Sequence, residues 1–197
     1  MTEFDPNERP EETAGVLTAI ARTAIERELS KAGAGEAVDK ASAQPEPAWL
    51  QEPAATFVTL TLDGRLRGCI GTLEAKRSLR ADVAANGRAA AFEDPRFPPL
   101  TAAELDDLVI EVSVLSEPEP ILCRDEAELL AALRPGTDGL VLRCGAHRST
   151  FLPQVWKSLP KPADFVAALK EKALLDRDFW SDEMRFLRYA VEKYRKD

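Results

Sequence analysis

Apolar residues recur at two different spacings along this chain. Between Thr13 and Ser30 they fall three or four positions apart, which is typical of a helix with one buried face. Over 57–62 and 109–115 the residues are mainly β-branched, aromatic or aliphatic, which favours strands. Helical and strand-like segments mix without a regular βαβ rhythm. The pattern therefore predicts an α+β fold with a mixed, mainly antiparallel sheet flanked by helices.

Further elements follow from helix caps and from Gly and Pro breakers. Polar N-cap residues and one Thr-x-x-Glu capping box mark where helices begin. The predicted helices lie at 79–92 after Ser78, at 101–104, at 126–133 after Asp125, and at 165–175 after Asp164. The predicted strands lie at 139–144, 147–152 and 184–194, with a helix as the alternative for the last. We interpret 1–12 as a mobile terminus, 31–53 as a loop, and 13–197 as one domain.

The strongest local signal is Asp63-Gly64, which stands between two strand-like runs at 57–62 and 65–71. This dipeptide favours a two-residue hairpin, because a type I′ turn needs positive φ at both central residues. The segment 57–72 is therefore predicted to form a β-hairpin.

A regular register from this turn places Arg67 opposite Leu60 and Cys69 opposite Val58. Both pairs then share one face of the ribbon, and Leu60 and Val58 favour burial. A guanidinium on such a face must find an anion, a carboxylate or the mouth of a cleft.

Gly68 and Gly71 lie inside the second strand of this hairpin. A glycine within a strand often marks a bulge or the close approach of another backbone or a ligand. Two interpretations stay open. The segment is either a strand that leads into a functional site, or a hairpin arm with a snorkelling arginine and a buried free cysteine.

Composition narrows the class of protein. The chain has 197 residues and a net charge of −8, from 26 basic and 34 acidic side chains. This charge argues against broad binding to nucleic acid or anionic membranes, although a local basic cleft is compatible with it. No apolar run approaches a membrane span, and the polar, acidic N-terminus is no signal peptide. Three cysteines without a CxxC pair fit a reducing compartment, so we expect a soluble, cytoplasmic protein.

Cys69 is the candidate nucleophile of the chain. Arg65 and Arg67 beside it would favour its thiolate form. A cysteine nucleophile usually needs a base, and the only histidine is His147. Any Cys–His dyad must therefore pair Cys69 with His147, and the alternative is that His147 is a surface turn residue.

Glu111 is a polar residue on an otherwise apolar strand face. We expect either an ion pair with Arg67, Arg96 or Arg148, or an acid near an anion site. One histidine and no clustered cysteines exclude the usual zinc ligand sets. The chain also lacks a P-loop and a GxGxxG motif. The sequence therefore predicts neither a metal site nor a nucleotide site, and the cofactor stays unknown.

Four segments occur together in order: FVTLTLDGRLRGCIGT at 57–72, DPRFPPL at 94–100, IEVSVLSEPEPI at 110–121 and FLPQVW at 151–156. This set resembles the AMMECR domain family, and in prokaryotes protein A of the AmmeMemoRadiSam system. Leu66-Arg-Gly-Cys-Ile-Gly71 matches the hallmark hexapeptide of that family. The resemblance runs from the first helix to the end of the chain.

The resemblance implies an α+β domain with a larger lobe from both chain ends, a smaller central lobe and a cleft between them. It also implies work alongside a Memo-type protein and a radical SAM protein. Carried over by position, the site residues are Arg67, Gly68, Cys69, Gly71, Asp94, Arg96, Glu111, Arg148 and Gln154. His147 lies just outside the matching pattern, so the resemblance does not support the dyad.

Two functions follow as hypotheses. The first is a small intracellular enzyme or modification factor that uses Cys69, with Glu111, in an arginine-lined cleft. The second is an adaptor or binding module for the Memo-type or radical SAM partner, with no chemistry of its own. Nucleic-acid binding is the least favoured class because of the negative charge.

Overall fold

The computed structural model describes residues 10–32 and 46–196, and the chain divides into two compact units. The first unit contains the chain up to Leu115 and the C-terminal residues from Glu192 onward. The second unit is the intervening segment Ser116–Val191. Each unit has its own sheet and its own hydrophobic core. The predicted α+β class is confirmed, as is the prediction that both chain ends build one unit.

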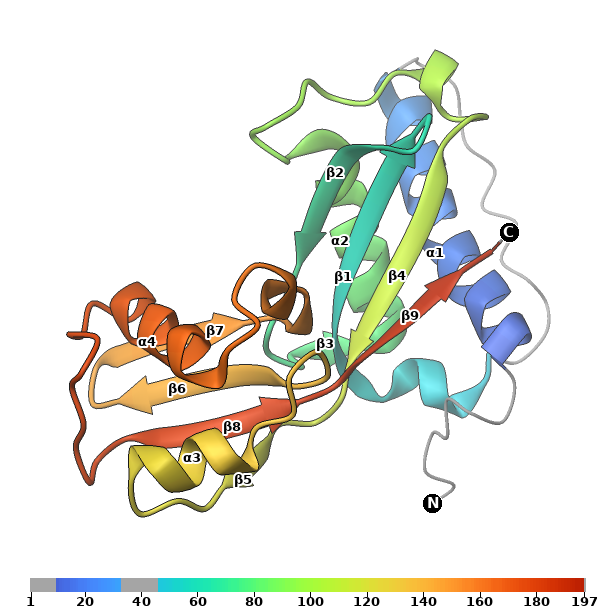
Figure 1. The fold of residues 1–197 in the computed structure, drawn as a ribbon. Helices are drawn as coiled ribbons and strands as arrows, with labels where there is room; N and C mark the ends of the chain where they lie inside the picture. Colours follow the sequence, from blue (N-terminus) through green and yellow to red (C-terminus); the bar gives the residue numbers. More distant parts are fainter. Residues whose placement is uncertain (1–9, 33–45, 197) are drawn as a thin grey trace. The chain divides into compact units, whose positions relative to one another are not determined.

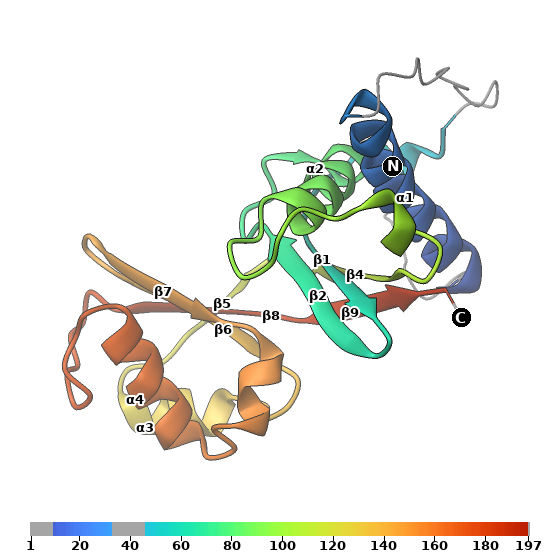
Figure 2. The same cartoon turned by 90° about the horizontal axis from the view of Figure 1, so that it is seen from above.

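The first unit is a sheet with helices on one face (Figures 1 and 2). Its sheet has the order β2-β1-β4-β9, and the short strand β3 also pairs with β1. The strands are β1 (Pro53–Leu62), β2 (Arg65–Gly71), β3 (Arg77–Ser78), β4 (Val109–Leu115) and β9 (Val191–Arg195). The helices are α1 (Pro10–Ala32) and α2 (Leu79–Phe92), with 3-10 turns η1 (Ala48–Gln51) and η2 (Ala102–Glu104).

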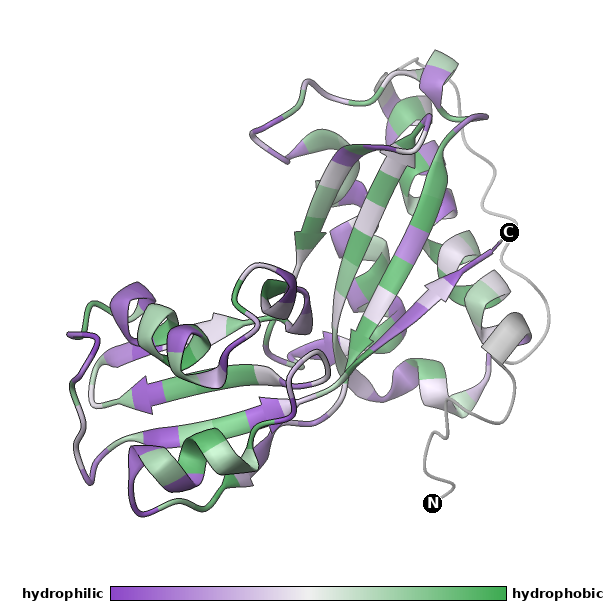
Figure 3. Ribbon diagram, in the orientation of Figure 1, coloured by the Kyte–Doolittle hydropathy of each residue, from purple (hydrophilic) through white to green (hydrophobic). Residues whose placement is uncertain are grey.

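The side-chain pattern of β1 and β4 explains why the helices cover only one face. Val58 and Leu60 are fully buried against the helices together with Val112, while Thr59 and Glu111 alternate with them. Figure 3 shows this alternation as bands of hydrophobic and hydrophilic colour along the two strands. We call the face that carries Thr59 and Glu111 the outer face of the first sheet.

Helix α2 packs closely on α1 at Gly87. A Cβ atom added at Gly87 would lie 3.0 Å from Cβ of Ala21 in α1. Asn86 and Gly87 are both buried, and the missing side chain of Gly87 lets the two helices approach.

The second unit is a four-stranded antiparallel sheet of order β5-β8-β6-β7. Its elements are β5 (Glu119–Ile121), α3 (Glu126–Ala132), β6 (Gly139–Cys144), β7 (His147–Phe151), η3 (Pro153–Lys157), α4 (Pro162–Lys172) and β8 (Arg185–Tyr189). In its core the rings of Trp156 and Phe165 stack with centroids 3.8 Å apart.

Several local predictions are confirmed. Ser78 caps α2 by accepting the N–H of Ala81, and Asp125 caps α3 by accepting the N–H of Glu128. The hairpin of β6 and β7 and strand β4 also lie where the pattern placed them.

Three boundaries are wrong. Helix α1 begins at Pro10, three residues before Thr13, and α4 begins at Pro162, two residues before Asp164, because proline suits the first helical turn. The predicted final strand 184–194 is two strands, β8 and β9, which pair in different sheets. The expectations for residues 1–9 and 33–45 lie outside the described residues. Within the described part of the chain, no helix is long and apolar enough to span a membrane.

Candidate functional site

Cys69 lies on β2 just beyond a β-bulge. Pairing leaves the Asp63-Gly64 turn as predicted, with Leu66 opposite Thr61, and then shifts so that Gly68 lies opposite Leu60 and Cys69 opposite Thr59. Arg67 is the extra residue of the bulge. The prediction that Cys69 shares a face with Val58 and Leu60 is therefore wrong. One inserted residue moves the cysteine to the outer face, because side chains alternate along a strand.

Gly68 shows why the strand bulges at this point. A Cβ atom added at Gly68 would lie 2.1 Å from the carbonyl oxygen of Ala90 in α2. Only glycine allows the strand to approach the helix backbone so closely. Gly71 has a similar role, because an added Cβ would lie 2.2 Å from the ring of Phe57.

Arg67 is buried and acts as a clamp between β2 and the 98–104 segment. Its Nε and Nη2 donate to the two carboxylate oxygens of Glu104, at 2.7 and 3.2 Å. Its Nη1 and Nη2 also donate to the carbonyls of Pro98 and Pro99. Glu104 additionally accepts the N–H of Thr101, as the predicted capping box requires, and also the hydroxyl of Thr101. The arginine and the Thr101 N–H lower the pKa of Glu104 to about 2, although burial opposes the shift.

Asp94 and Arg96 hold the backbone of Cys69 from the free edge of β2. Oδ2 of Asp94 accepts the N–H of Cys69 at 2.9 Å, and Nη2 of Arg96 donates to the carbonyl of Cys69 at 3.3 Å. β2 ends the sheet, so these two side chains satisfy groups that a neighbouring strand would otherwise bind. Arg96 also donates to both carboxylate oxygens of Asp94.

The Arg96 hydrogen bond holds the pKa of Asp94 well below its usual range, helped by the backbone N–H groups of Cys69 and Arg96 and opposed by burial. The carboxylate therefore stays charged, and the clamp on Cys69 stays closed at ordinary pH.

The outer face presents a row of polar groups on neighbouring strands. Sγ of Cys69 lies 3.3 Å from the hydroxyl of Thr59, and Thr59 is opposite Glu111 on β4. Since strands are about 4.8 Å apart, the thiol and the carboxylate are roughly 10 Å apart with Thr59 between them. Oε1 of Glu111 accepts a 2.6 Å hydrogen bond from Lys193 of β9. We call Cys69, Thr59, Glu111 and Lys193 the Cys69 row.

Glu111 has a different partner from the three arginines proposed for it. It pairs with Lys193, whereas Arg67 pairs with Glu104 and Arg96 with Asp94. Glu111 does form an ion pair, but the predicted arginine partners are wrong, because β9 supplies the cation.

The other predicted residues belong to the second unit. Arg148 and His147 lie on β7 and Gln154 lies in η3, and all three side chains are exposed. Nδ1 of His147 is 2.8 Å from the carbonyl oxygen of Ala173, which holds its ring to the end of α4. A dyad of Cys69 with His147 would join residues of two units and stays a prediction.

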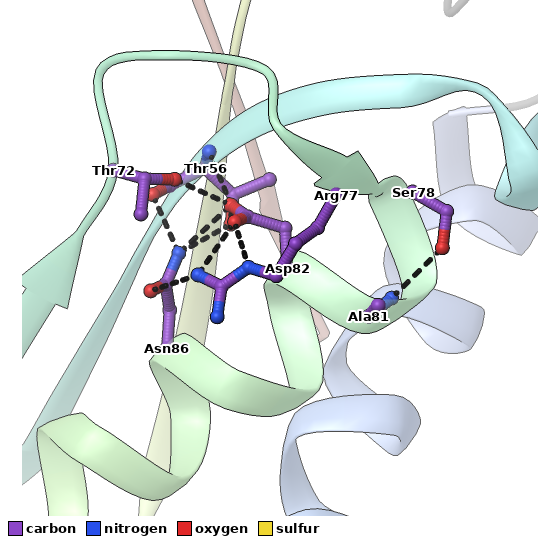
Figure 4. Close-up of polar contacts among 7 residues, drawn as sticks. All are labelled: Thr56, Thr72, Arg77, Ser78, Ala81, Asp82 and Asn86. Atoms are coloured by element: carbon purple, nitrogen blue, oxygen red, sulfur yellow. Dashed lines mark hydrogen bonds and ion pairs between the residues drawn. The ribbon is translucent and has the colours of Figure 1, made fainter.

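A polar cluster that was not predicted from the sequence surrounds Asp82, which is 1 % exposed (Figure 4). Oδ2 of Asp82 accepts the hydroxyls of Thr56 and Thr72 and the amide of Asn86, and Oδ1 accepts Nε and Nη2 of Arg77. The N–H of Thr56 donates to the same carboxylate. The only signal for this cluster was the i, i+4 spacing of Asp82 and Asn86 on an alanine-rich helix.

The Asp82 cluster fixes the far end of the hairpin. It joins β1, the end of β2, β3 and α2 through one buried carboxylate whose oxygens are fully used. We interpret it as structural support for the Cys69 row. Among residues 10–32 and 46–196, no group of three or more His, Cys, Asp or Glu side chains could hold a metal ion.

The α+β architecture agrees with a match to known proteins. A sequence model of the AMMECR1 family matches residues 18–194, so the chain belongs to the AMMECR1 family. The resemblance of the four ordered segments to the AMMECR domain family is thereby confirmed.

Similar proteins occur in archaea and bacteria. A protein of Thermofilum pendens is 37% identical over 184 residues, covering 86% of this chain and 82% of that one. A protein of Thermotoga maritima is 37% identical over 163 residues, covering 82% and 88%. The crystal structure of "Uncharacterized Protein PH0010" from Pyrococcus horikoshii superposes with a TM-score of 0.74 at 33% identity, covering 93% of this chain and 91% of that one. None of these names states an activity.

Proposed function

We propose that this AMMECR1-family chain is a thiol-dependent modification factor in which Cys69 is the reacting group. The observation that carries the proposal is the bulge in β2. Without it, Cys69 would pair with Val58 and face the helix-covered core, where a cysteine is an inert apolar residue. With it, the thiol lies on the outer face and is half-buried.

The surroundings of Cys69 support a fixed and accessible thiol. Its N–H and carbonyl are both held, by Asp94 and Arg96, so the backbone cannot turn the side chain away. Thr59 offers a hydroxyl within hydrogen-bonding distance of the sulfur. A site of this kind restrains the reacting atom before the substrate arrives, which is a general requirement of catalysis.

A thiol nucleophile needs a proton acceptor. Glu111 was the sequence candidate for an acid–base role, but its carboxylate is already paired with Lys193. We therefore expect a proton acceptor for the thiol to come from the substrate or a partner, and Glu111 to orient rather than to transfer a proton.

The partners follow from the family resemblance. We propose that the chain works with a Memo-type protein and a radical SAM protein, on an anionic small molecule or a side chain of a partner. We also propose a cytoplasmic setting, because sparse cysteines without a CxxC pair fit a reducing compartment. No cofactor is assigned to the chain itself.

An adaptor without its own chemistry is the second candidate. The Glu111–Lys193 ion pair favours it, because a paired carboxylate is better suited to docking than to accepting a proton. In that case Cys69→Ser would be tolerated, whereas Glu111→Gln would weaken association with the partner.

Alkylation of the free cysteines tests the reactive thiol directly. Cys123 is the internal reference for a slowly reacting thiol, because it is also partly exposed, while burial together with Glu128 and Asp125 raises its pKa. We expect iodoacetamide to modify Cys69 about tenfold faster than Cys123 near neutral pH. Mass spectrometry of peptides from timed samples measures both rates in one tube. Equal rates would remove the basis for a reactive Cys69.

A test of function compares two variants in which the same substitution, cysteine to serine, is made at different sites. Cys69→Ser should abolish the activity of a reconstituted system with both partner proteins, and Cys123→Ser should leave it unchanged. Full activity in a folded Cys69→Ser variant would reject the thiol mechanism and favour the adaptor.

A further inference from the structure

Three arginines lie in one cross-strand row of the second sheet. Arg143 of β6 is directly opposite Arg148 of β7 on one side and directly opposite Arg185 of β8 on the other. Directly opposed residues in an antiparallel sheet point to the same face, with Cβ atoms about 5 Å apart. All three side chains are exposed. We call Arg143, Arg148 and Arg185 the arginine row.

The arginine row lies on the face of the sheet opposite the core of its unit. Its neighbours along the strands, Leu142 and Phe186, are buried in that core, so the arginines point the other way. The row is next to the turn at Gly145, at the hydrophilic arrowhead of β6 in Figure 3.

Such a row opposes the stability of the sheet. Like charges directly opposite each other are destabilising, and here one arginine has a like charge on each side. In the described part of the chain, Arg143 and Arg185 pair with no carboxylate, and Arg185 donates instead to the carbonyls of Asp182 and Met184. A bound anion would convert this repulsion into attraction, because the guanidinium fork binds carboxylates and phosphates in bidentate geometry.

We propose that the arginine row is a docking surface for an acidic segment of a partner protein. The row spans two strand spacings, roughly 10 Å, and an extended peptide places every second side chain about 6.7 Å apart on one face. Two or three carboxylates of such a peptide can therefore reach the row together. The net charge of −8 disfavours non-specific binding of polyanions, so an acidic ligand needs a local group of cations such as this row.

The face does not suit single-stranded nucleic acid. Such ligands are held by aromatic side chains on which bases stack. The aromatic residue of β8 on this face, Tyr189, is 3 % exposed, and its hydroxyl is occupied by Thr150 and the carbonyl of Phe151. An acidic peptide therefore fits the chemistry better than RNA. This surface lies in the second unit and does not depend on the role of Cys69.

Fluorescence anisotropy with a labelled peptide of alternating glutamate and threonine tests the proposal. The full chain should bind this peptide at about 50 mM salt and lose most of the affinity near 1 M salt. We expect Arg143→Glu to weaken binding about tenfold or more, and Arg143→Gln to weaken it less. Lys157→Glu is the matched control, because Lys157 is an exposed cation of the same unit outside the row. It should change binding less than about twofold.

Each alternative gives a different result. Equal losses for Arg143→Glu and Lys157→Glu would show that only total charge matters. Tighter binding of a labelled oligouridylate, with the same dependence on Arg143, would assign the row to nucleic acid. Self-association that Arg143→Glu abolishes in sedimentation would assign it to a second copy of this chain. No saturable peptide binding at low salt would also overturn the proposal.

Discussion

Arginine is used in opposite ways around Cys69 and in the arginine row. Arg67 and Arg96 each donate to a carboxylate whose side chain is largely buried, Glu104 at 24% exposed and Asp94 at 2%. Arg143 has another arginine on each side and is exposed. The arginines near the hallmark motif therefore fix the backbone, whereas Arg143 lies on an exposed sheet surface between two like charges. Whether an arginine has a structural or a binding role is indicated by the group that its guanidinium contacts, and not by how near it lies to a sequence motif.

An arginine that donates to a buried carboxylate also occurs in the second unit. Nε and Nη2 of Arg134 donate to the buried carboxylate of Asp138, whose carbonyl accepts the indole N–H of Trp156. The contrast is therefore between arginines that pair with a buried carboxylate and arginines that are exposed on a sheet, and both kinds occur in the second unit.

The largest effect is expected at Asp82. Asp82→Ala removes the shared acceptor of Thr56, Thr72 and Asn86 and leaves Arg77 without its carboxylate. We expect the free energy of unfolding to fall by about 3 kcal/mol, because several buried donors lose their partner at once. Urea denaturation measures the change.

Glu93→Ala is the control for Asp82→Ala, because Glu93 is an exposed carboxylate paired with the exposed Arg88. It should change stability by less than about 0.5 kcal/mol. A similar small loss for Asp82→Ala would show that the buried cluster contributes little.

A smaller, pH-dependent effect is expected at Glu104. Its folded-state pKa is about 2, below the ordinary value of 4.5. The stabilisation is therefore fully present above about pH 4.5 and is lost as the pH falls through about 2. Glu104→Gln should cost about 1–2 kcal/mol near neutral pH and almost nothing near pH 2.

Denaturation of both proteins across pH 6 to 2 measures this difference, in steps of about half a unit. An unchanged pH slope in Glu104→Gln would mean that the Arg67 clamp does not stabilise the fold. Glu93→Gln provides the exposed control for the same titration range.

Local elements of this fold were predictable because their determinants are local. The capping residues Ser78 and Asp125 and the turn Asp63-Gly64 act within a few residues. The strand β4 follows from its β-branched residues alone.

The bulge was not predictable because its determinants are distant in sequence. Arg67 finds Glu104 37 residues further on, and Gly68 fits against Ala90 in another element. A glycine inside the strand indicated a bulge or a close approach in general, but not where the register would shift. The face of Cys69 depended on that single inserted residue, so the sequence named the correct candidate residue and placed it on the wrong face.

The smallest expected effect on stability distinguishes a strand cation flanked by like charges from a strand cation paired with a carboxylate. Arg143→Thr should raise the free energy of unfolding by roughly 0.5 kcal/mol, since it removes a like charge from between Arg148 and Arg185. Lys193→Thr should lower it by up to about 1 kcal/mol, since it breaks the partly exposed pair with Glu111. Both changes place the same β-branched residue in a strand, so propensity cannot explain opposite signs.

Salt dependence separates charge from packing in this pair of variants. Both differences should shrink in about 1 M salt, where the Debye length is about 3 Å and exposed charges are screened. A gain in Arg143→Thr that persists in high salt would come from strand propensity. A loss in Arg143→Thr would mean that the arginine row already contributes to the stability of its sheet, and the reason to expect a bound anion there would disappear.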